Sequence, residues 1–221
     1  MFNWLFWLTL VVAMIEWVAV AKQWKRVRWL TKPGTMILLI AWFTQVGGWK
    51  GPLLWFGLGL VFSLLGDIFL MLPKRFFLAG MGAFFTAHVF TIVGFNQNPI
   101  NLTWQVMLPM LAVAGAFSAL NGRIRSGLVD KGENKLILPV MGYATILSVM
   151  WLAALSSLFR PEWQRPAAIL ASLGGGLFFF SDSVLAYNRF VRPIENGDVA
   201  VMVSYHLAQI CIALGAVMQF A

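Results

Sequence analysis

Charged side chains are scarce in this chain of 221 residues: Asp, Glu, Lys and Arg make up 11% of it, against 60% hydrophobic residues. Soluble domains average about 25% charged and about 45–50% apolar residues. The mean hydropathy of +0.80 therefore excludes a soluble protein and predicts an integral membrane protein. Apolar segments follow one another almost end to end, which leaves no room for a soluble module, and we assign residues 1–221 to a single membrane domain.

The residues that carry much of enzyme chemistry are also few. The single cysteine, Cys211, can form no disulfide within the chain. Only two histidines occur, His88 and His206, whereas a zinc site needs three or four suitably spaced ligands. A mixed histidine–carboxylate metal site is weakly indicated, and we expect neither a metal nor another cofactor. No phosphate-cradling loop with a lysine, nucleophile elbow or dithiol motif is present, which argues against nucleotide, serine-hydrolase and thiol chemistry.

Eight segments are apolar enough to cross a bilayer as helices, which takes roughly 17–25 mainly apolar residues. Pro33, Pro52, Pro161 and Pro193 stand at the joins between segments, where helices begin or cannot continue. The predicted fold class is all-α, a polytopic bundle of about eight transmembrane helices. The segments are about 2–21, 34–49, 52–72, 76–95, 104–121, 136–158, 164–187 and 198–219.

The two halves of the chain resemble each other. Gly66-Asp67-Ile68-Phe69-Leu70 parallels Ser181-Asp182-Ser183-Val184-Leu185, and the next segment carries a histidine in each case. One interpretation is a parallel repeat of four plus four helices. The other is chance similarity between apolar segments.

Basic residues concentrate on one side of the predicted bundle. The connections after the first, third, fifth and seventh segments hold 13 of the 16 Lys and Arg residues. The positive-inside rule makes these connections cytoplasmic and leaves both termini outside. The formal charge of +8 then reflects topology, and we expect no nucleic-acid partner, although the basic rim can attract lipid headgroups.

Two aspartates, Asp67 and Asp182, lie inside membrane segments, and each is followed 21 to 24 residues later by one of the histidines. A carboxylate at membrane depth costs several kcal/mol unless it is paired or protonated, so such residues usually mark a site. At about 1.5 Å per residue, both aspartates, His206 and Glu16 fall in the cytoplasmic half, with His88 deeper. We therefore predict a shared cavity that opens toward the cytoplasm.

Each of these residues also has a purely structural interpretation. Asp67, with Ser63 one turn earlier, could hold helices together, and both histidines could be satisfied core residues. Glu16 could contact Lys22 or Trp17 near the interface.

Several motifs resemble those of the bacterial YhhN family, whose eukaryotic relatives are lysoplasmalogenases. They are the run SLLGDIFLML at 63–72, the stretch from Phe84 to His88, Lys32-Pro33, and Phe180-Ser181-Asp182-Ser183 with Asn188-Arg189-Phe190. The resemblance covers essentially the whole chain, and the two aspartate motifs are its most specific parts.

This resemblance implies an eight-helix hydrolase of the bacterial cytoplasmic (inner) membrane. Its substrate would be a lysoplasmalogen lying among membrane lipid, cleaved at the vinyl-ether bond to a fatty aldehyde and a glycerophospho-alcohol. The family has also been grouped with zinc-using hydrolases similar to alkaline ceramidases. The last segment here holds one histidine, His206, instead of a pair.

The chemistry of a vinyl ether suits two buried carboxyl groups. Hydrolysis begins with protonation of the carbon–carbon double bond, and water captures the resulting oxocarbenium ion. The catalyst needs an acid that is protonated near neutral pH and a negative group beside the cation; burial and a second carboxylate both favour a protonated carboxyl group. We expect Asp67 and Asp182 to divide these roles in an order that the sequence leaves open, with His88 or His206 relaying protons or holding water.

Further residues are candidates for substrate binding. The headgroup phosphate would meet Lys32, Asn188 and Arg189 at the cytoplasmic mouth. The remaining candidates near the carboxyl groups are Ser63, Ser181 and Tyr205.

Three other functions fit the sequence. They are a hydrolase of another lyso-lipid bond, a transporter or flippase of a small amphiphile with the two aspartates as proton-coupling residues, and a non-catalytic lipid-binding or scaffold protein. A transporter predicts movement across sealed liposomes without a covalent product. A scaffold predicts that neutral aspartate variants lose stability. Nothing in the sequence gives the oligomeric state.

Overall fold

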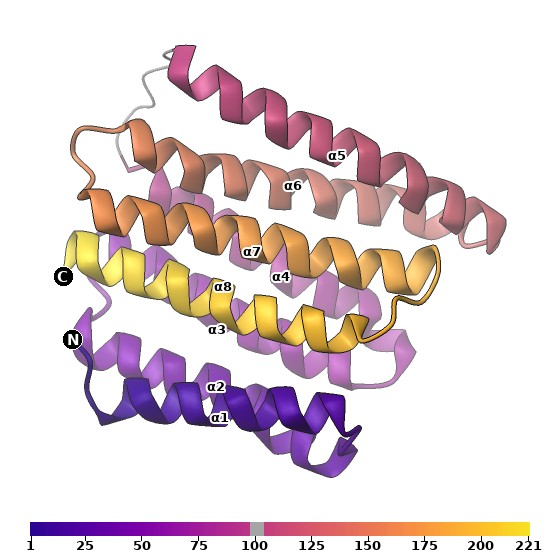
Figure 1. Ribbon diagram of the computed structural model, residues 1–221, viewed down its shortest axis with the longest axis horizontal. Helices are drawn as coiled ribbons and strands as arrows, with labels where there is room; N and C mark the ends of the chain where they lie inside the picture. Colours follow the sequence, from indigo (N-terminus) through magenta and orange to yellow (C-terminus); the bar gives the residue numbers. More distant parts are fainter. Residues whose placement is uncertain (98–103) are drawn as a thin grey trace.

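Long α-helices make up most of the computed structural model, which describes residues 1–97 and 104–221 (Figure 1). Within these ranges no strand occurs, so the all-α fold class is confirmed. Short 3-10 turns at Lys74–Phe76, Asn134–Leu136 and Ser157–Phe159 lie beside three of the helices. The eight helices are α1 (Trp4–Ala21), α2 (Lys25–Val46), α3 (Pro52–Met71), α4 (Phe77–Phe95), α5 (Trp104–Asp130), α6 (Ile137–Ser156), α7 (Arg165–Phe190) and α8 (Gly197–Phe220).

Seven of the helices in the described ranges are long and apolar enough to cross a membrane, which makes the chain an integral membrane protein. The exception is α2, whose first eight positions include four basic residues. Pro52 begins α3 as predicted, and Pro161 and Pro193 lie in the connections around α7.

The predicted start of the second helix, at residue 34, is wrong. Helix α2 begins at Lys25, and Pro33 lies inside it instead of at a join. A proline removes one backbone N–H donor and crowds the preceding turn, but neighbouring helices and Thr or Ser side chains can stabilise such a site in a membrane protein. Here the Thr35 hydroxyl, two residues after the proline, donates to the carbonyl oxygen of Thr31, two residues before it, at 2.8 Å.

The predicted end of the fifth helix, at residue 121, is also wrong. Helix α5 continues to Asp130, so Arg123 and Arg125 are helical. The sequence offers no strong helix breaker before Gly132, which has a φ of +71° that favours glycine. Long basic side chains can extend toward the interface from a helix that continues.

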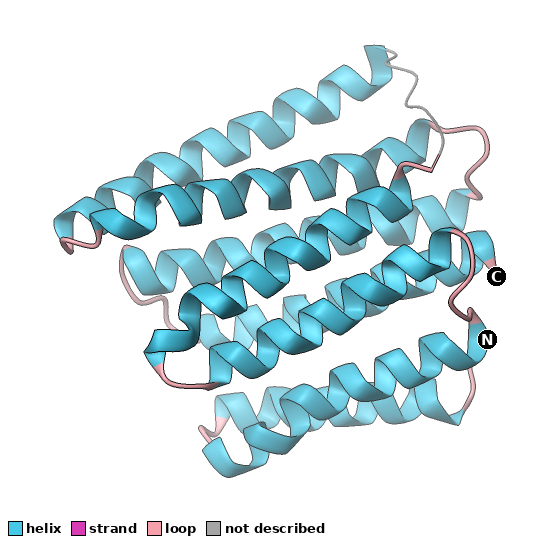
Figure 2. Ribbon diagram, turned by 180° about the vertical axis from the view of Figure 1, so that it is seen from behind, coloured by secondary structure: helices cyan, strands magenta, loops and turns pink. Residues whose placement is uncertain are grey.

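The two termini lie at the same end of the bundle, and the α1–α2, α3–α4, α5–α6 and α7–α8 connections lie at the other (Figures 1 and 2). Helix α8 occupies the centre, in contact with α1, α2, α3 and α7. Helix α5 lies at the edge and packs on α6 and α7. Asp67 and Asp182 lie in the later turns of α3 and α7, toward the end of the bundle that carries the basic connections.

Close helix pairs hold these aspartates in place. The most extensive contacts are those of α3 with α4 and of α7 with α8, the equivalent pairs of the predicted repeat, which itself stays a prediction. A Cβ on Gly66 would lie 2.5 Å from the Phe84 ring, and a Cβ on Gly174 would lie 2.9 Å from the Ala208 carbonyl oxygen. Both helix pairs thus depend on the absence of a side chain at a crossing.

Candidate active site

A cavity of about 240 Å³ lies in the half of the bundle that carries the basic connections. Its lining comes from α2, α3, α4, α6, α7 and α8, and most of its wall is apolar. It contains both Asp67 and Asp182, which the sequence places 115 residues apart (182 − 67). Tyr205, eight residues beyond Gly197 at the start of α8, lies roughly 12 Å inside the bundle by helical rise. The structure therefore brings the carboxyl groups of Asp67 and Asp182 to one cavity.

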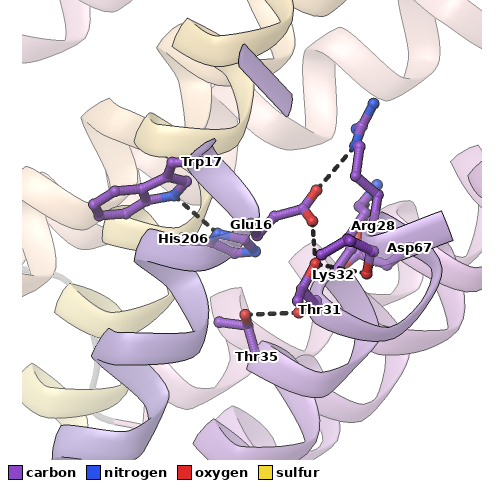
Figure 3. Close-up of polar contacts among 9 residues, drawn as sticks. Glu16, Trp17, Arg28, Thr31, Lys32, Thr35, Asp67 and His206 are labelled. Carbon is purple, nitrogen blue, oxygen red and sulfur yellow. Dashed lines mark hydrogen bonds and ion pairs between the residues drawn. The ribbon is translucent and has the colours of Figure 1, made fainter. Parts of the chain in front are cut away.

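Asp67 is held by a cation and a phenol. Its side chain on α3 is buried, with Oδ1 lying 3.1 Å from the Lys32 ammonium on α2 (Figure 3). The hydroxyl of Tyr205 on α8 donates to Oδ2 at 2.7 Å. A lysine at this distance stabilises the charged carboxylate, and the phenol satisfies its second oxygen.

Asp182 has a different set of partners. It accepts a hydrogen bond from the hydroxyl of Tyr143 on α6, whose oxygen lies 3.1 Å from His88 Nε2 on α4. Because the single hydroxyl proton of Tyr143 points to Asp182, we assign Nε2 of His88 as the donor to Tyr143. Two ion pairs occur in the described ranges, and Asp182 takes part in neither. Asp182 therefore lies at the end of a hydrogen-bonded series, His88–Tyr143–Asp182, that contains no cationic partner.

An aromatic cluster fixes the groups around these carboxyls. The Phe178 ring packs edge to face against His88 at 4.7 Å and against Tyr205 at 5.5 Å between centroids. The Phe84 ring packs edge to face against Phe178 and Tyr205, with 6.2 Å and 5.8 Å between ring centroids. Such edge-to-face contacts restrict ring motion, so the phenol and imidazole that position the carboxyl groups are themselves held.

Glu16, on α1, is the centre of a second group of polar contacts, which it makes with α2 (Figure 3). It is fully buried, and it accepts from Arg28 Nε at 3.1 Å and from the Thr31 hydroxyl. The expected contact with Lys22 or Trp17 is replaced by these two residues of α2. Arg28, Thr31 and Lys32 follow helical spacing on one face of α2, so this face binds Glu16 on one side and Asp67 on the other.

The predicted site residues fall into two groups. Six of them line the cavity: Lys32, Asp67, Ser181, Asp182, Arg189 and Tyr205. His88 does not line the cavity but hydrogen-bonds to Tyr143, which does, and Ser63 is buried one turn before Asp67 on α3 without lining the cavity.

His206 and Asn188 lie away from the cavity, and Ser181 lines it but serves as a contact between helices. His206 accepts from Trp17 Nε1 at its Nδ1 atom, 3.1 Å away. Asn188 accepts from the Ile194 backbone N–H at 2.8 Å and so stabilises the connection after α7. Ser181 does line the cavity, but its hydroxyl donates to the Val201 carbonyl oxygen, which is a contact between α7 and α8.

Three polar residues of the cavity lining were absent from the predicted site: Arg28, Tyr143 and Asp198. Tyr143 is one of three tyrosines in the chain and lies in an apolar run, a pattern that by itself indicates an interfacial aromatic residue. Arg28 lies in what was interpreted as a connection. Its signal was the helical spacing of Arg28, Thr31, Lys32 and Thr35, which Pro33 obscured.

The donor set does not fit a resident zinc ion. Across the described ranges no three His, Cys, Asp or Glu side chains come together as a ligand group. His88 and His206 each bind a different aromatic partner. We therefore assign no step of the chemistry to a metal.

Comparisons with known proteins show relatives that are similar to this chain in sequence. Human lysoplasmalogenase TMEM86B is 30% identical over 157 residues, which cover 71% of this chain and 61% of the human protein. Mouse lysoplasmalogenase TMEM86B is 31% identical over 186 residues, 84% of this chain and 72% of the mouse protein. The chain thus spans less than two thirds of the human relative's length.

A bacterial relative matches over more of its length. The protein named uncharacterized membrane protein YhhN from Escherichia coli O157:H7 is 25% identical over 204 residues, 90% of this chain and 93% of that protein. No solved structure matches the chain. The model of the YhhN family matches residues 27–216, a range that includes both aspartates and the whole cavity lining, and the chain belongs to the YhhN family.

Proposed function

We propose that this protein is a lysoplasmalogenase-type hydrolase, which cleaves the vinyl-ether bond of 1-alkenyl lysophospholipids. The names of the mammalian relatives support this activity. The observation that carries it is the pair of carboxyl groups in one mostly apolar cavity. Each accepts a hydrogen bond from a tyrosine, but of the two only Asp67 has a cationic partner. Such unequal environments are the usual way to obtain an acid and an anion at one pH.

The contacts suggest which carboxyl group does what. Asp67 is the carboxylate, because the Lys32 ammonium at 3.1 Å stabilises its charge. Asp182 is the proton donor, because its partner is the neutral phenol of Tyr143 and desolvation favours an uncharged carboxyl group. The sequence alone left this order open.

The reaction then follows from vinyl-ether chemistry. The Asp182 proton is transferred to C2 of the alkenyl chain, and the double-bond electrons form the new C–H bond. The positive charge that develops on C1 and the ether oxygen is stabilised by the nearby Asp67 carboxylate. Water adds to C1 and loses a proton to the Asp182 carboxylate, which gives a hemiacetal and restores the Asp182 acid. Collapse of the hemiacetal releases the fatty aldehyde, the glycerophospho-alcohol takes up a proton, and Asp182 ends protonated.

The apolar part of the cavity wall suits the hydrocarbon of the substrate. Helices α4, α6 and α7 supply much of it, through Phe77, Met81, Phe84, Val140, Leu185, Ala186 and Phe190, and Leu70 of α3 and Val201 and Met202 of α8 complete it. By the charge of the α1–α2, α3–α4, α5–α6 and α7–α8 connections, we place this end at the cytoplasmic side of a bacterial inner membrane, with both termini outside. A lysophospholipid of the cytoplasmic leaflet would then reach the carboxyl groups without crossing the bilayer.

Isotope labelling tests the proposed bond cleavage. Turnover of 1-alkenyl lysophospholipid in D₂O is expected to give an aldehyde with one deuterium at C2, since that proton comes from solvent through an exchangeable carboxyl group. Turnover in H₂¹⁸O is expected to leave the glycerol hydroxyl unlabelled, because water attacks the alkenyl carbon. Heavy oxygen in the glycerophospho-alcohol would show cleavage on the glycerol side and would overturn the mechanism.

A further inference from the structure

A polar groove adjoins the cavity at the same end of the bundle. It has a volume of about 530 Å³ and lies between the α1–α2 turn and the α7–α8 connection, with a lining that includes Gln23, Lys25, Arg28, Asn188 and Asp198. Only Arg28 and Asp198 line both this groove and the cavity. They therefore mark the boundary between an apolar space that holds the carboxyl groups and a polar space that faces the membrane surface.

Arg28 has a fixed position at this boundary and uses one of its guanidinium N–H donors, at Nε. Its Nε binds the Oε1 atom of Glu16 at 3.1 Å, and its side chain is 31% exposed whereas that of Glu16 is 0% exposed. Glu16 also accepts from Thr31, which ties it to the same face of α2. In the described part of the chain, Arg28 forms no other side-chain hydrogen bond. The guanidinium is thus oriented through Nε, and among the described residues its two terminal nitrogens have no hydrogen-bond partner.

The other cations near the cavity are already engaged. Lys32 is paired with Asp67, and the Arg189 guanidinium lies 3.7 Å over the centroid of the Phe77 ring. Asn188, predicted to meet the phosphate, uses its carbonyl oxygen on the Ile194 backbone. Of the three basic side chains that line the cavity, Arg28 alone also lines the polar groove, and the buried Glu16 carboxylate fixes its orientation there.

We propose that Arg28, positioned by Glu16, binds the phosphate of the lysophospholipid, and that the polar groove receives the remainder of its headgroup. A guanidinium binds phosphate oxygens through two parallel N–H donors, which gives both affinity and direction. The Asp198 carboxylate at the same boundary disfavours a doubly charged phosphate monoester, so we assign a phosphodiester. This inference rests on the proposed function, because it places the phosphate relative to a vinyl ether at Asp67 and Asp182.

Binding of uncleavable ligands tests the assignment without relying on turnover. The probes are a 1-alkyl lysophosphocholine, whose saturated ether cannot be protonated in this way, and the uncharged 1-alkylglycerol, measured with the full chain in lipid nanodiscs. Arg28→Gln is expected to weaken binding of the phospholipid by roughly 10- to 100-fold, the loss of a charge-assisted hydrogen-bond pair. Binding of the alkylglycerol should stay within about twofold, since it lacks the phosphate.

Two further variants separate binding from folding. Arg26→Gln removes the same charge from an exposed position of α2 that lines neither space, and it should change neither affinity. Because Arg28→Gln leaves Glu16 buried without its cation, the double variant Glu16→Gln/Arg28→Gln provides a neutral pair that should fold and show the same selective loss. Glu16→Gln alone should weaken phospholipid binding less than Arg28→Gln does.

The outcomes are distinct. Equal losses for both probes, or no loss for either, would overturn the role of Arg28. Equally tight binding of free glycerophosphocholine, which has no chain, would overturn the assignment to a membrane lipid. If the wild-type protein binds the ether phospholipid selectively but releases no aldehyde from its alkenyl counterpart, the proposed function fails while the phosphate site stands.

Discussion

At the scale of single residues, the main feature is that two aspartates of similar sequence context, which line one cavity, have different partners. Asp67 contacts Lys32 and Tyr205, and Asp182 contacts Tyr143 alone among hydrogen-bonding side chains of the described residues. The position of both aspartates toward the end of the bundle with the basic connections was predictable from helical rise and hydropathy. Their partners were not, because each contact joins helices that are far apart in the sequence.

Neutralising Asp67 should damage stability as well as activity. Asp67→Asn leaves the Lys32 ammonium buried beside an amide, and removing one partner of a buried ion pair typically costs about 3–5 kcal/mol. We expect a clearly lowered midpoint of thermal unfolding in detergent, together with loss of turnover.

A second change at Lys32 provides the control for that variant. Asp67→Asn/Lys32→Gln removes both charges, so the unfolding midpoint should return most of the way to that of the wild type while turnover stays lost. Recovery of activity in the double variant would show that Asp67 serves only to hold α2 and α3 together.

Tyr143 and His88 should act as one unit. Since His88 contacts the cavity through the Tyr143 hydroxyl, Tyr143→Phe is expected to lower kcat roughly tenfold, the effect of one hydrogen bond. Adding His88→Ala to that variant should cause little further loss. A double-mutant cycle of kcat checks this, and additive losses would mean that His88 acts by another route.

At the scale of helices, the sequence predicts where most of them lie but not where α2 begins. Pro33 is a local signal for a helix start, and tertiary contacts outweigh it: Glu16 and Asp67 bind Arg28 and Lys32 on turns of α2 that precede the proline. Basic residues before a proline are typical of a loop, and the sequence therefore predicted a connection here. The missed residue Arg28 follows directly from that error.

Helix crossings should be sensitive to a single methyl group. A Cβ at Gly174 would lie 2.9 Å from both the Ala208 carbonyl oxygen and the Ile212 amide nitrogen, so α7 and α8 must separate. We expect Gly174→Ala to destabilise the fold by about 1–3 kcal/mol, as overpacking usually does, and to lower activity by displacing Asp182 from the cavity.

The matched control lies on α4. Gly82 has no atom within 4 Å of an added Cβ, so Gly82→Ala should leave both the unfolding midpoint and turnover close to those of the wild type. Equal effects of the two alanine variants would show that the α7–α8 crossing does not depend on close approach at Gly174.

At the scale of the whole molecule, the bundle separates its termini from its basic connections. Both termini lie at one end and the cavity lies toward the other (Figures 1 and 2). The sequence predicted this arrangement because the eight predicted helices, an even number, return the chain to its starting side. What it could not predict is the order of neighbours, such as the central position of α8, because apolar helices carry little information about which faces meet.

The orientation in the membrane is testable with a fusion. If the basic connections are cytoplasmic, alkaline phosphatase attached after Ala221 should be active when the protein is expressed in a bacterial inner membrane. A fusion placed after Lys131, in the α5–α6 connection, should be inactive. The opposite pattern would put the cavity on the outer side and contradict access from the cytoplasmic leaflet.

The most direct test of the account is aldehyde release by the purified protein from 1-alkenyl lysophospholipid, offered beside its 1-acyl counterpart, with Asp182→Asn as the variant. We predict aldehyde from the alkenyl lipid, no fatty acid from the acyl lipid, and at least a roughly hundredfold lower rate in the folded variant, the scale of a general acid. Asparagine can still accept from Tyr143, so the variant should fold. Fatty acid released from the acyl lipid, or near-normal aldehyde release by Asp182→Asn, would contradict the account.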